Sequence, residues 1–428
     1  MRVFKFGGAS VKDADAVRNL GAVMQNYPDD DIVVVVSAMG KTTNALEKIT
    51  HEYFYKEGSL QASVDELKAY HQEILLDLFP DKEHKIYTDV NNVLVELEWI
   101  IEDEPIKDYD FEYDQLVSLG ELISTKIVSA WLNETGIANT WIDARDLIKT
   151  DDTYREALVD WTATEKGVKK VLEPMFTGKG GAVAVTQGFI AVTTENYNTT
   201  LGREGSDYTA SILGSILEAV DVTIWKDVPG VLNADPKWFA KTEKLEALSY
   251  HDAIELAFFG ATVIHPKTLK PLQNKAIPLY VKSFFDPKQD GTIITGMKKL
   301  PKDLATVPSF IFKVNQVLIS ILPRDYSFIV EENLSDIFKV FAEDGVKINL
   351  MQHAALSFSV CVDADERKIP NLIEVLQEEY KVLYNEGVEL VTIRDYDQST
   401  IDRVTVGKKI FVEQKSRQTA RFVVRNVS

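Results

Sequence analysis

Residues 32–36 read Ile-Val-Val-Val-Val, and this run of five β-branched side chains restricts the fold more than any other feature. A strand that faces water on one side alternates apolar and polar residues, whereas a strand covered on both faces is apolar throughout. Further strand-like runs occur at 3–6, 140–142, 182–186, 222–225 and 277–281, and helical stretches separate them. We therefore predict an α/β domain over residues 1–300, with a central, mainly parallel sheet between helices.

The pattern changes after Pro301 and Pro308. We predict a strand at 310–322, a helix at 331–344, strands at 346–350 and 356–362, a helix at 369–380 and a strand at 388–394. This βαββαβ order is the ferredoxin-like α+β arrangement. Two further strands, 404–412 and 420–424, follow without a helix of their own. The sequence thus predicts a second domain over residues 301–428, with a reduced second unit at its end.

The charge of the chain excludes some classes of partner. Its 47 basic and 66 acidic residues leave a net charge of −19, and residues 51–115 alone hold 18 acids against five lysines. Nucleic acids and membrane surfaces are polyanions, so we expect neither as a partner. The single cysteine, Cys361, cannot form an internal disulfide, and the amino terminus enters a strand without an apolar signal region. We expect a soluble, cytoplasmic protein.

Two glycine-containing loops follow the first two predicted strands. Lys5-Phe6-Gly7-Gly8-Ala9-Ser10 places a lysine and two glycines between a strand and a helix, where backbone N–H groups can approach a phosphate. Ser37-Ala38-Met39-Gly40 follows the second strand, and Thr42-Thr43-Asn44 opens the next helix. Strand carboxyl ends meet at one edge of a parallel sheet, so the two loops should be neighbours. Read separately, each is equally well an ordinary turn, the first with a surface lysine.

Three later segments carry further polar groups. The segment 199–208, Thr-Thr-Leu-Gly-Arg-Glu-Gly-Ser-Asp-Tyr, precedes a helix, and Arg203 could clamp a carboxylate with its planar fork. The alternative without a ligand is that Asp207 caps the helix and Arg203 is a solvated surface charge. Another strand leads into the segment Trp225-Lys226-Asp227-Val228-Pro229-Gly230. Glu121 is an acid in the first turn of a predicted helix, a position that the helix dipole alone could explain. Six scattered histidines and one cysteine predict no protein metal site.

Taken together, these segments resemble the aspartate kinases of the amino acid kinase superfamily. The motifs KFGGAS, VVSAMGKTTN, SLGELIS, TQGFI, TTLGREGSDYTA, IWKDVPGV, NADP and FGATVIHPKTL occur in the family's order over about residues 1–300. The tail is similar to the family's ACT-type regulatory region, and we expect no dehydrogenase domain after it. The resemblance implies the amino acid kinase fold and a monofunctional enzyme that uses ATP to phosphorylate the side-chain carboxylate of L-aspartate. It also implies Mg²⁺ bound with ATP and a homodimer.

The resemblance also implies roles for individual residues. Lys5 and Asp207 would be catalytic, the aspartate orienting the lysine. Glu121 would accept the amino group of aspartate, Arg203 would bind its α-carboxylate, and Thr43, Phe189 and Ser206 would line the same pocket. ATP would be bound by Lys5, Gly7, Gly8, Ser37, Lys226, Asp227, Leu232 and Lys237.

Several positions depart from the family pattern. Ala9 replaces a threonine, and Thr262 replaces a common lysine, so we expect Lys226 or Lys267 to restore that charge. Asn349 and His353 stand where lysine-inhibited relatives contact the effector with an acid and a hydroxyl, which makes lysine inhibition doubtful. Two alternatives remain open: a related amino acid kinase with another substrate, and a non-catalytic amino-acid sensor on the same fold.

Overall fold

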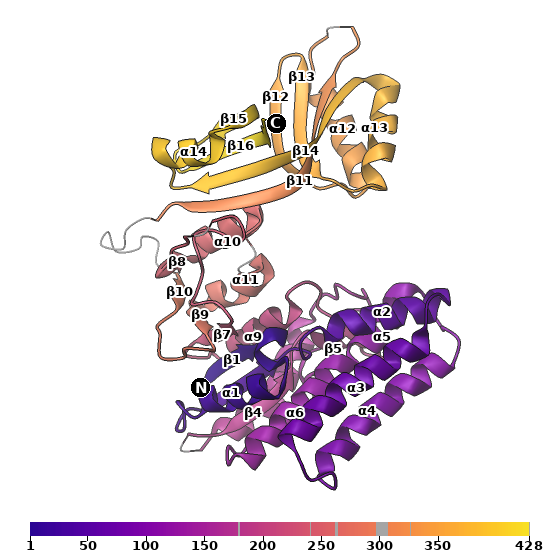
Figure 1. Ribbon diagram of the computed structural model, residues 1–428, viewed down its shortest axis with the longest axis vertical. Coiled ribbons are helices and arrows are strands. Elements are labelled where there is room, and N and C mark those ends of the chain that lie inside the picture. The colour runs from indigo at the N-terminus through magenta and orange to yellow at the C-terminus, as the bar shows by residue number, and fades with distance from the viewer. Residues whose placement is uncertain (179, 240, 262–263, 297–306, 326, 428) are drawn as a thin grey trace. The chain divides into compact units, whose positions relative to one another are not determined.

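The computed structural model describes residues 1–428 apart from 179, 240, 262–263, 297–306, 326 and 428 (Figure 1). The chain divides into two compact units. The N-terminal unit comprises Met1–Val231, Lys244–Ile254 and Val263–Leu304. The C-terminal unit comprises Leu232–Glu243, Glu255–Thr262 and Ala305–Ser428, so it takes two segments from before residue 300. The first of these belongs there because Phe239 packs on Phe310 and Phe312.

An eight-stranded sheet with the order β3-β4-β2-β1-β7-β9-β10-β8 forms the centre of the N-terminal unit. The pairs from β3 through β9 are parallel, and β10 is antiparallel to β9. Strand β2, the Ile-Val-Val-Val-Val run, is buried at every residue, as its composition predicted. The strands are β1 Arg2–Phe6, β2 Ile32–Val36, β3 Thr140–Ile142, β4 Val183–Gln187, β7 Val222–Lys226, β8 Ala247–Ser249, β9 Leu279–Ser283 and β10 Thr292–Thr295.

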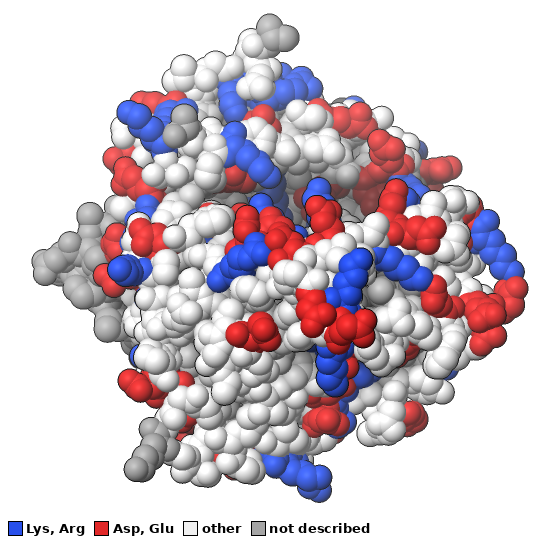
Figure 2. All heavy atoms as spheres, turned by 60° about the horizontal axis from the view of Figure 1, so that its bottom comes forward, with Lys and Arg blue, Asp and Glu red and all other residues white. Residues whose placement is uncertain are grey.

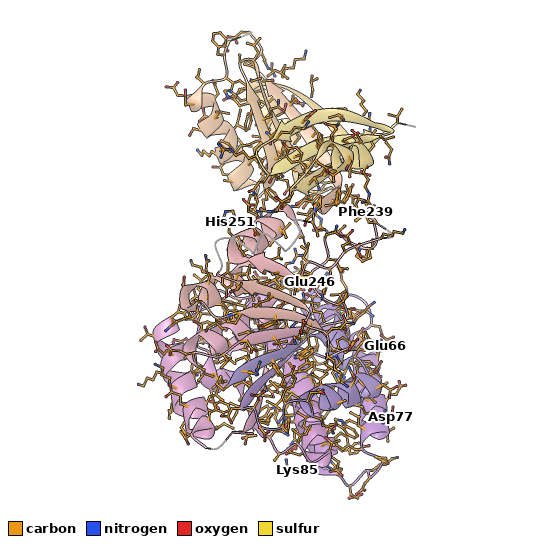
Figure 3. The ribbon with its side chains drawn as sticks, turned by 90° about the vertical axis from the view of Figure 1, so that its left-hand side faces the viewer. Glu66, Asp77, Lys85, Phe239, Glu246 and His251 are labelled. Carbon is orange, nitrogen blue, oxygen red and sulfur yellow. The ribbon has the colours of Figure 1, made fainter. Side chains whose placement is uncertain are left out.

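Helices accompany this sheet, and the longest come from the acidic part of the chain (Figure 1). In this region α4 packs along α6, and α2 along α3. The charged side chains of α3 and α4 face outward, as Glu66, Asp77 and Lys85 illustrate in Figure 3. A short hairpin, β5 Ile190–Val192 and β6 Asn198–Thr200, lies apart from the main sheet. The helices are α1 Ala14–Met24, α2 Thr42–Tyr55, α3 Leu60–Leu78, α4 Lys85–Glu102, α5 Tyr109–Val117, α6 Leu119–Glu134, α7 Ala144–Leu147, α8 Trp161–Leu172, α9 Gly205–Ile216, α10 Tyr250–Phe259 and α11 Pro266–Lys275.

The C-terminal unit contains an antiparallel sheet with the order β12-β13-β11-β14-β16-β15. The predicted βαββαβ order is confirmed by β11, α12, β12, β13, α13 and β14. Apolar residues of α12 and α13 share one core with β11 and β13. The elements are β11 Ser309–Leu322, α12 Glu331–Glu343, β12 Ile348–Ala354, β13 Ser357–Asp363, α13 Lys368–Glu379, β14 Lys381–Arg394, α14 Gln398–Thr405, β15 Lys408–Lys415 and β16 Thr419–Asn426.

The prediction that no helix accompanies the last two strands is wrong, because α14 precedes them. The strand predicted at 404–412 begins only at Lys408, and a helix that the sequence analysis did not foresee occupies the preceding residues. Asp397 caps this helix by accepting a hydrogen bond from the Thr400 backbone N–H, and the Thr400 hydroxyl accepts one from the Asp397 N–H. Eight residues are too few for a helical period to stand out. The second half of the sheet therefore does carry a helix.

Acidic and basic side chains are interspersed on the face shown in Figure 2. Ion pairs also join neighbouring helical segments, among them Lys56 with Glu104 and Lys68 with Glu98. Within the described part of the chain, none of the helices combines the length and apolarity required to cross a membrane.

Candidate active site

The loops after β1 and β2 meet, as predicted from the strand order. The Gly40 backbone N–H donates to the Gly8 carbonyl at 3.0 Å, and the Ser37 N–H donates to the Phe6 carbonyl at 3.0 Å. A Cβ atom on Gly8 would lie 2.8 Å from the Gly40 carbonyl oxygen and 2.9 Å from that of Ala38. Because both obstructing atoms belong to the backbone, no side chain fits at position 8, and the close contact of the two loops requires glycine.

Lys5 points into the space beside these loops from the last part of β1. Its Nζ lies 2.5 Å from Oδ1 of Asp207, which stands in the first turn of α9. Both side chains are buried, with 9% and 2% of each residue exposed. The chain thus holds a nearly desolvated cation with one carboxylate, the arrangement the resemblance implied for these two residues. Such a charge can act on an anion more strongly than it could in water.

Glu121 is the second buried carboxylate of the site. It lies in the first turn of α6, where its Oε1 accepts a hydrogen bond from the Ala38 backbone N–H at 3.2 Å. Among the described residues its Oε2 has no hydrogen-bond partner. Burial raises the pKa of the Glu121 carboxyl to about 8, because the neighbouring Ala38 N–H and Lys5 offset only part of the desolvation. In the ionised form of Glu121, this Oε2 is an acceptor that can bind a cationic group.

Arg203 has an exposed guanidinium, and it lines the same cavity as the buried carboxylates of Asp207 and Glu121. Its segment is shaped by close packing: a Cβ on Gly205 would lie 2.6 Å from the Phe189 ring, and a Cβ on Gly188 would lie 2.4 Å from the Cβ of Ser206. Phe189 itself has a left-handed backbone, with φ of +72°, and its N–H donates to the Thr209 hydroxyl at 3.0 Å. The glycines of the motif thus let α9 begin directly against the Phe189 turn.

One cavity of about 840 Å³ brings most of the predicted side chains together. It is lined by the predicted residues Lys5, Ser37, Thr43, Glu121, Phe189, Arg203, Ser206, Asp207 and Lys226. The same cavity is lined by residues that sequence reasoning missed: Glu47, Asp110, Tyr113, Thr153, Tyr154, Arg155, Glu156, Gly202, Glu204 and Gly205. Most of these come from α5 and from the loop at 150–159, which contain no recognisable motif.

The other residues predicted to bind ATP do not line the cavity. Gly7 and Gly8 adjoin it through the Lys5 strand, and Asp227 is exposed directly after β7. Leu232 and Lys237 belong to the C-terminal unit, so their role at the site remains a prediction. Thr262 lies outside the described residues. Lys267, one of the two lysines expected to compensate for it, is in the first turn of α11 and does not line the cavity, whereas Lys226 does.

The two candidate regulatory residues differ in their surroundings. Asn349 is buried, and its side chain hydrogen-bonds Gln316, Asp363 and Lys313 at 2.8, 3.0 and 2.8 Å. His353 is exposed on β12, and its Nε2 lies 3.1 Å from the Ile329 carbonyl oxygen. The Asn349 amide is thus already engaged within the C-terminal unit, which leaves it poorly placed to contact an effector.

The comparisons with known proteins agree with this geometry. The model of the amino acid kinase family matches residues 1–283. Aspartokinase 2, chloroplastic, of Arabidopsis thaliana is 30% identical over 88% of this chain and 70% of its own length. The crystal structure of E. coli aspartokinase III in complex with aspartate and ADP superposes with a TM-score of 0.81 at 26% identity, covering 99% of this chain and 96% of that one.

The chain belongs to the amino acid kinase family. Within that family its similarity is to aspartokinases, including the bifunctional aspartokinase/homoserine dehydrogenase 1, chloroplastic, of A. thaliana, at 29% identity. The chain spans 42% of the length of that bifunctional relative, and 89% of the chain is covered by the match.

Proposed function

We propose that this protein transfers the γ-phosphoryl group of ATP to the side-chain carboxylate of L-aspartate, forming 4-phospho-L-aspartate. The observation that carries the proposal is the convergence in one cavity of the buried Lys5–Asp207 pair, an unpartnered oxygen of Glu121 and the exposed guanidinium of Arg203. An amino acid with a carboxylate side chain has one group for each of these three features: an ammonium group for Glu121, an α-carboxylate for Arg203 and a side-chain carboxylate for Lys5. The likeness to an aspartokinase structure that contains aspartate and ADP supports the same assignment.

The polarity of the cavity suggests how aspartate lies in it. Its ammonium group would bind the free oxygen of Glu121, and its α-carboxylate would bind Arg203 through the guanidinium fork. The side-chain carboxylate would then face Lys5, beside the Gly7–Gly8 loop, Ser37 and Lys226, where the triphosphate would lie. Thr43, Phe189 and Ser206 would fill the remaining wall. Asp227, Leu232 and Lys237 are proposed to contact the rest of the nucleotide.

Catalysis in this arrangement requires no general base, because a carboxyl with an ordinary pKa of about 3.9 is already ionised at neutral pH. The work of the protein is to align the two anions and to neutralise charge on the transferring group. Lys5 supplies that positive charge, and Asp207 fixes the direction of its ammonium group. Removing a preorganised charge of this kind typically lowers kcat by about 10²- to 10³-fold.

Magnesium fits this site only as a companion of the nucleotide. In the described part of the chain, no three His, Cys, Asp or Glu side chains are grouped as a metal cage. Mg²⁺ usually keeps several waters and binds substrate phosphates with one or two carboxylates. We therefore propose that it enters with ATP and supplies charge neutralisation at the phosphates, with Asp207 as the nearest carboxylate to the phosphate-binding lysine.

The wider role follows from the reaction. We propose that the product begins the biosynthesis of lysine, threonine and methionine in the cytoplasm. The C-terminal unit is proposed to mediate homodimer formation and to respond to an amino-acid effector, with His353 more accessible than Asn349. A related E. coli aspartokinase III was crystallised with lysine and aspartate, but the residues here make lysine a doubtful effector.

A coupled ADP-release assay tests the proposal. Aspartate, glutamate and N-acetylglutamate are compared as acceptors at equal concentration, and lysine, threonine and methionine are then titrated against the best one. We expect turnover with aspartate and little with the other two. Preferential turnover of another acceptor would identify a different amino acid kinase, and no turnover with any of them would favour a non-catalytic sensor.

A further inference from the structure

The loop at 150–159 forms a closed flap beside the cavity. Thr150 and Val159 are joined by an antiparallel bridge, and the Asp151 N–H donates to the Leu158 carbonyl at 3.0 Å. The Asp151 carboxylate accepts from the Leu158 N–H at 2.8 Å and so closes the flap at its base. The tip, residues 153–156, lines the cavity. The flap is therefore an ordered wall of the site.

A buried carboxylate on α5 fixes the tip of the flap. Asp114 accepts hydrogen bonds from the Arg155 backbone N–H at 2.9 Å, from the Thr200 N–H at 2.9 Å and from the Thr200 hydroxyl at 2.7 Å. Thr200 is three residues before Arg203, so one anchor positions both segments. Arg155 has a left-handed backbone, with φ of +67°, a conformation that an arginine adopts only when its surroundings enforce it.

The side chain of Arg155 is held much less firmly than its backbone. Its guanidinium lies 4.4 Å from the ring centre of Tyr113, and Nη1 is 3.1 Å from Oδ1 of Asp110. The two charged side chains are 44% and 56% exposed. Ion pairs this exposed contribute little stability, because water and salt screen both charges. Arg155, Asp110 and Tyr113 all line the same cavity as Arg203.

We propose that Arg155 is a second substrate-binding guanidinium, and that a carboxylate of the amino-acid substrate replaces Asp110 as its partner. This inference rests on the proposed function. A guanidinium fork binds a carboxylate through two parallel hydrogen bonds, whereas Asp110 accepts a single hydrogen bond of 3.1 Å from Arg155. The Tyr113 ring keeps the fork oriented during the exchange, and the Tyr113 hydroxyl is itself fixed by Glu47 at 2.7 Å.

Two substitutions distinguish this role from a structural ion pair. Arg155→Gln removes the cation, so the KM for aspartate and its Kd should rise about tenfold or more, as expected for a lost charge-assisted hydrogen bond. Asp110→Asn removes the competing anion but keeps Arg155, so both constants should fall or stay unchanged. If the ion pair were merely structural, the two substitutions would break the same contact and would change both constants in the same direction.

Turnover, calorimetric binding of L-aspartate and thermal unfolding are measured on the full chain. Arg18→Gln is the matched control, because Arg18 forms an exposed pair with Asp77 of α3, and neither residue lines the cavity. Arg155→Lys, which keeps the charge and loses the fork, should fall between wild type and Arg155→Gln. The KM for ATP should be unchanged in all variants.

Equal aspartate binding by wild type and Arg155→Gln, or weaker binding by both Arg155→Gln and Asp110→Asn, would overturn the inference. Failure of the proposed function has a different signature, which is absence of turnover with aspartate in the wild-type enzyme. The calorimetric comparison tests the role of Arg155 whether or not the enzyme turns over aspartate. If wild type binds no aspartate, both the proposed function and the role of Arg155 are overturned.

Discussion

Replacing Glu121 with glutamine tests the most unusual electrostatic feature of the site. The carboxyl is buried, one oxygen accepts from Ala38 and the other has no partner among the described residues. Burial raises its pKa to about 8, so at pH 7 roughly one molecule in ten carries the ionised form. Binding of an ammonium group requires that form. We therefore expect aspartate to bind more tightly as the pH rises from 7 to 8.5.

The magnitude follows from two opposing contributions. A hydrogen bond between the substrate ammonium and a carboxylate contributes about 1.5–3 kcal/mol, and ionising Glu121 at pH 7 costs about 1.4 kcal/mol for one unit of pKa. The advantage of wild type over Glu121→Gln in kcat/KM for aspartate should thus be at most about fifteenfold at pH 7. At pH 8.5 the ionisation cost has largely gone, and the advantage should reach about 10- to 150-fold.

The assay is the ratio of the two kcat/KM values across pH 6–8.5 under saturating ATP. Because the raised pKa lies near 8, most of the ionisation of Glu121 falls within this pH range, and the ratio must grow with the ionised fraction. Glu52→Gln is the control, since Glu52 is also a buried helical carboxylate but does not line the cavity. A ratio that stays constant across this range, or equal activity of the two enzymes at pH 8.5, would refute the assignment of Glu121.

Three further predictions concern other groups of the site. Lys5→Ala should lower kcat by about 10²-fold or more while the protein still melts cooperatively, as measured by stopped assays and thermal unfolding. Arg203→Ala should mainly raise the KM for aspartate, by about tenfold, with a smaller effect on kcat; a change confined to the KM for ATP would contradict its role. Asp114→Ala should lower the free energy of unfolding by about 1–3 kcal/mol, because the backbone N–H groups of Arg155 and Thr200 then lose their acceptor. Chemical denaturation measures this, and unchanged stability would argue against Asp114 as the anchor of the flap.

The sequence was informative where local chemistry determines structure. The β-branched run at 32–36 predicted a fully buried parallel strand, and the structure confirms it. The loops after β1 and β2 were expected to meet because parallel strands end at one edge of a sheet, and the Gly40–Gly8 hydrogen bond joins them.

The rest depended on contacts between segments that are distant in the chain. Asp110 and Tyr113 contact Arg155 only because the tip of the flap packs against α5, and neither segment contains a motif. Nothing in the sequence separates Asp114 from the other acids of its helix, because its partner Thr200 is 86 residues away in the chain. Helix α14 was missed because two turns are too short for a visible period, and its capping residue was the only local signal.

Phosphoryl transfer to a carboxylate is tested most directly by trapping the product with hydroxylamine, which converts an acyl phosphate to a hydroxamate. Wild type should form hydroxamate only when both ATP and L-aspartate are present, in amounts equal to the ADP released, and Lys5→Ala should form almost none. ADP release from aspartate without hydroxamate, or wild-type yields from Lys5→Ala, would contradict transfer to a carboxylate at this site.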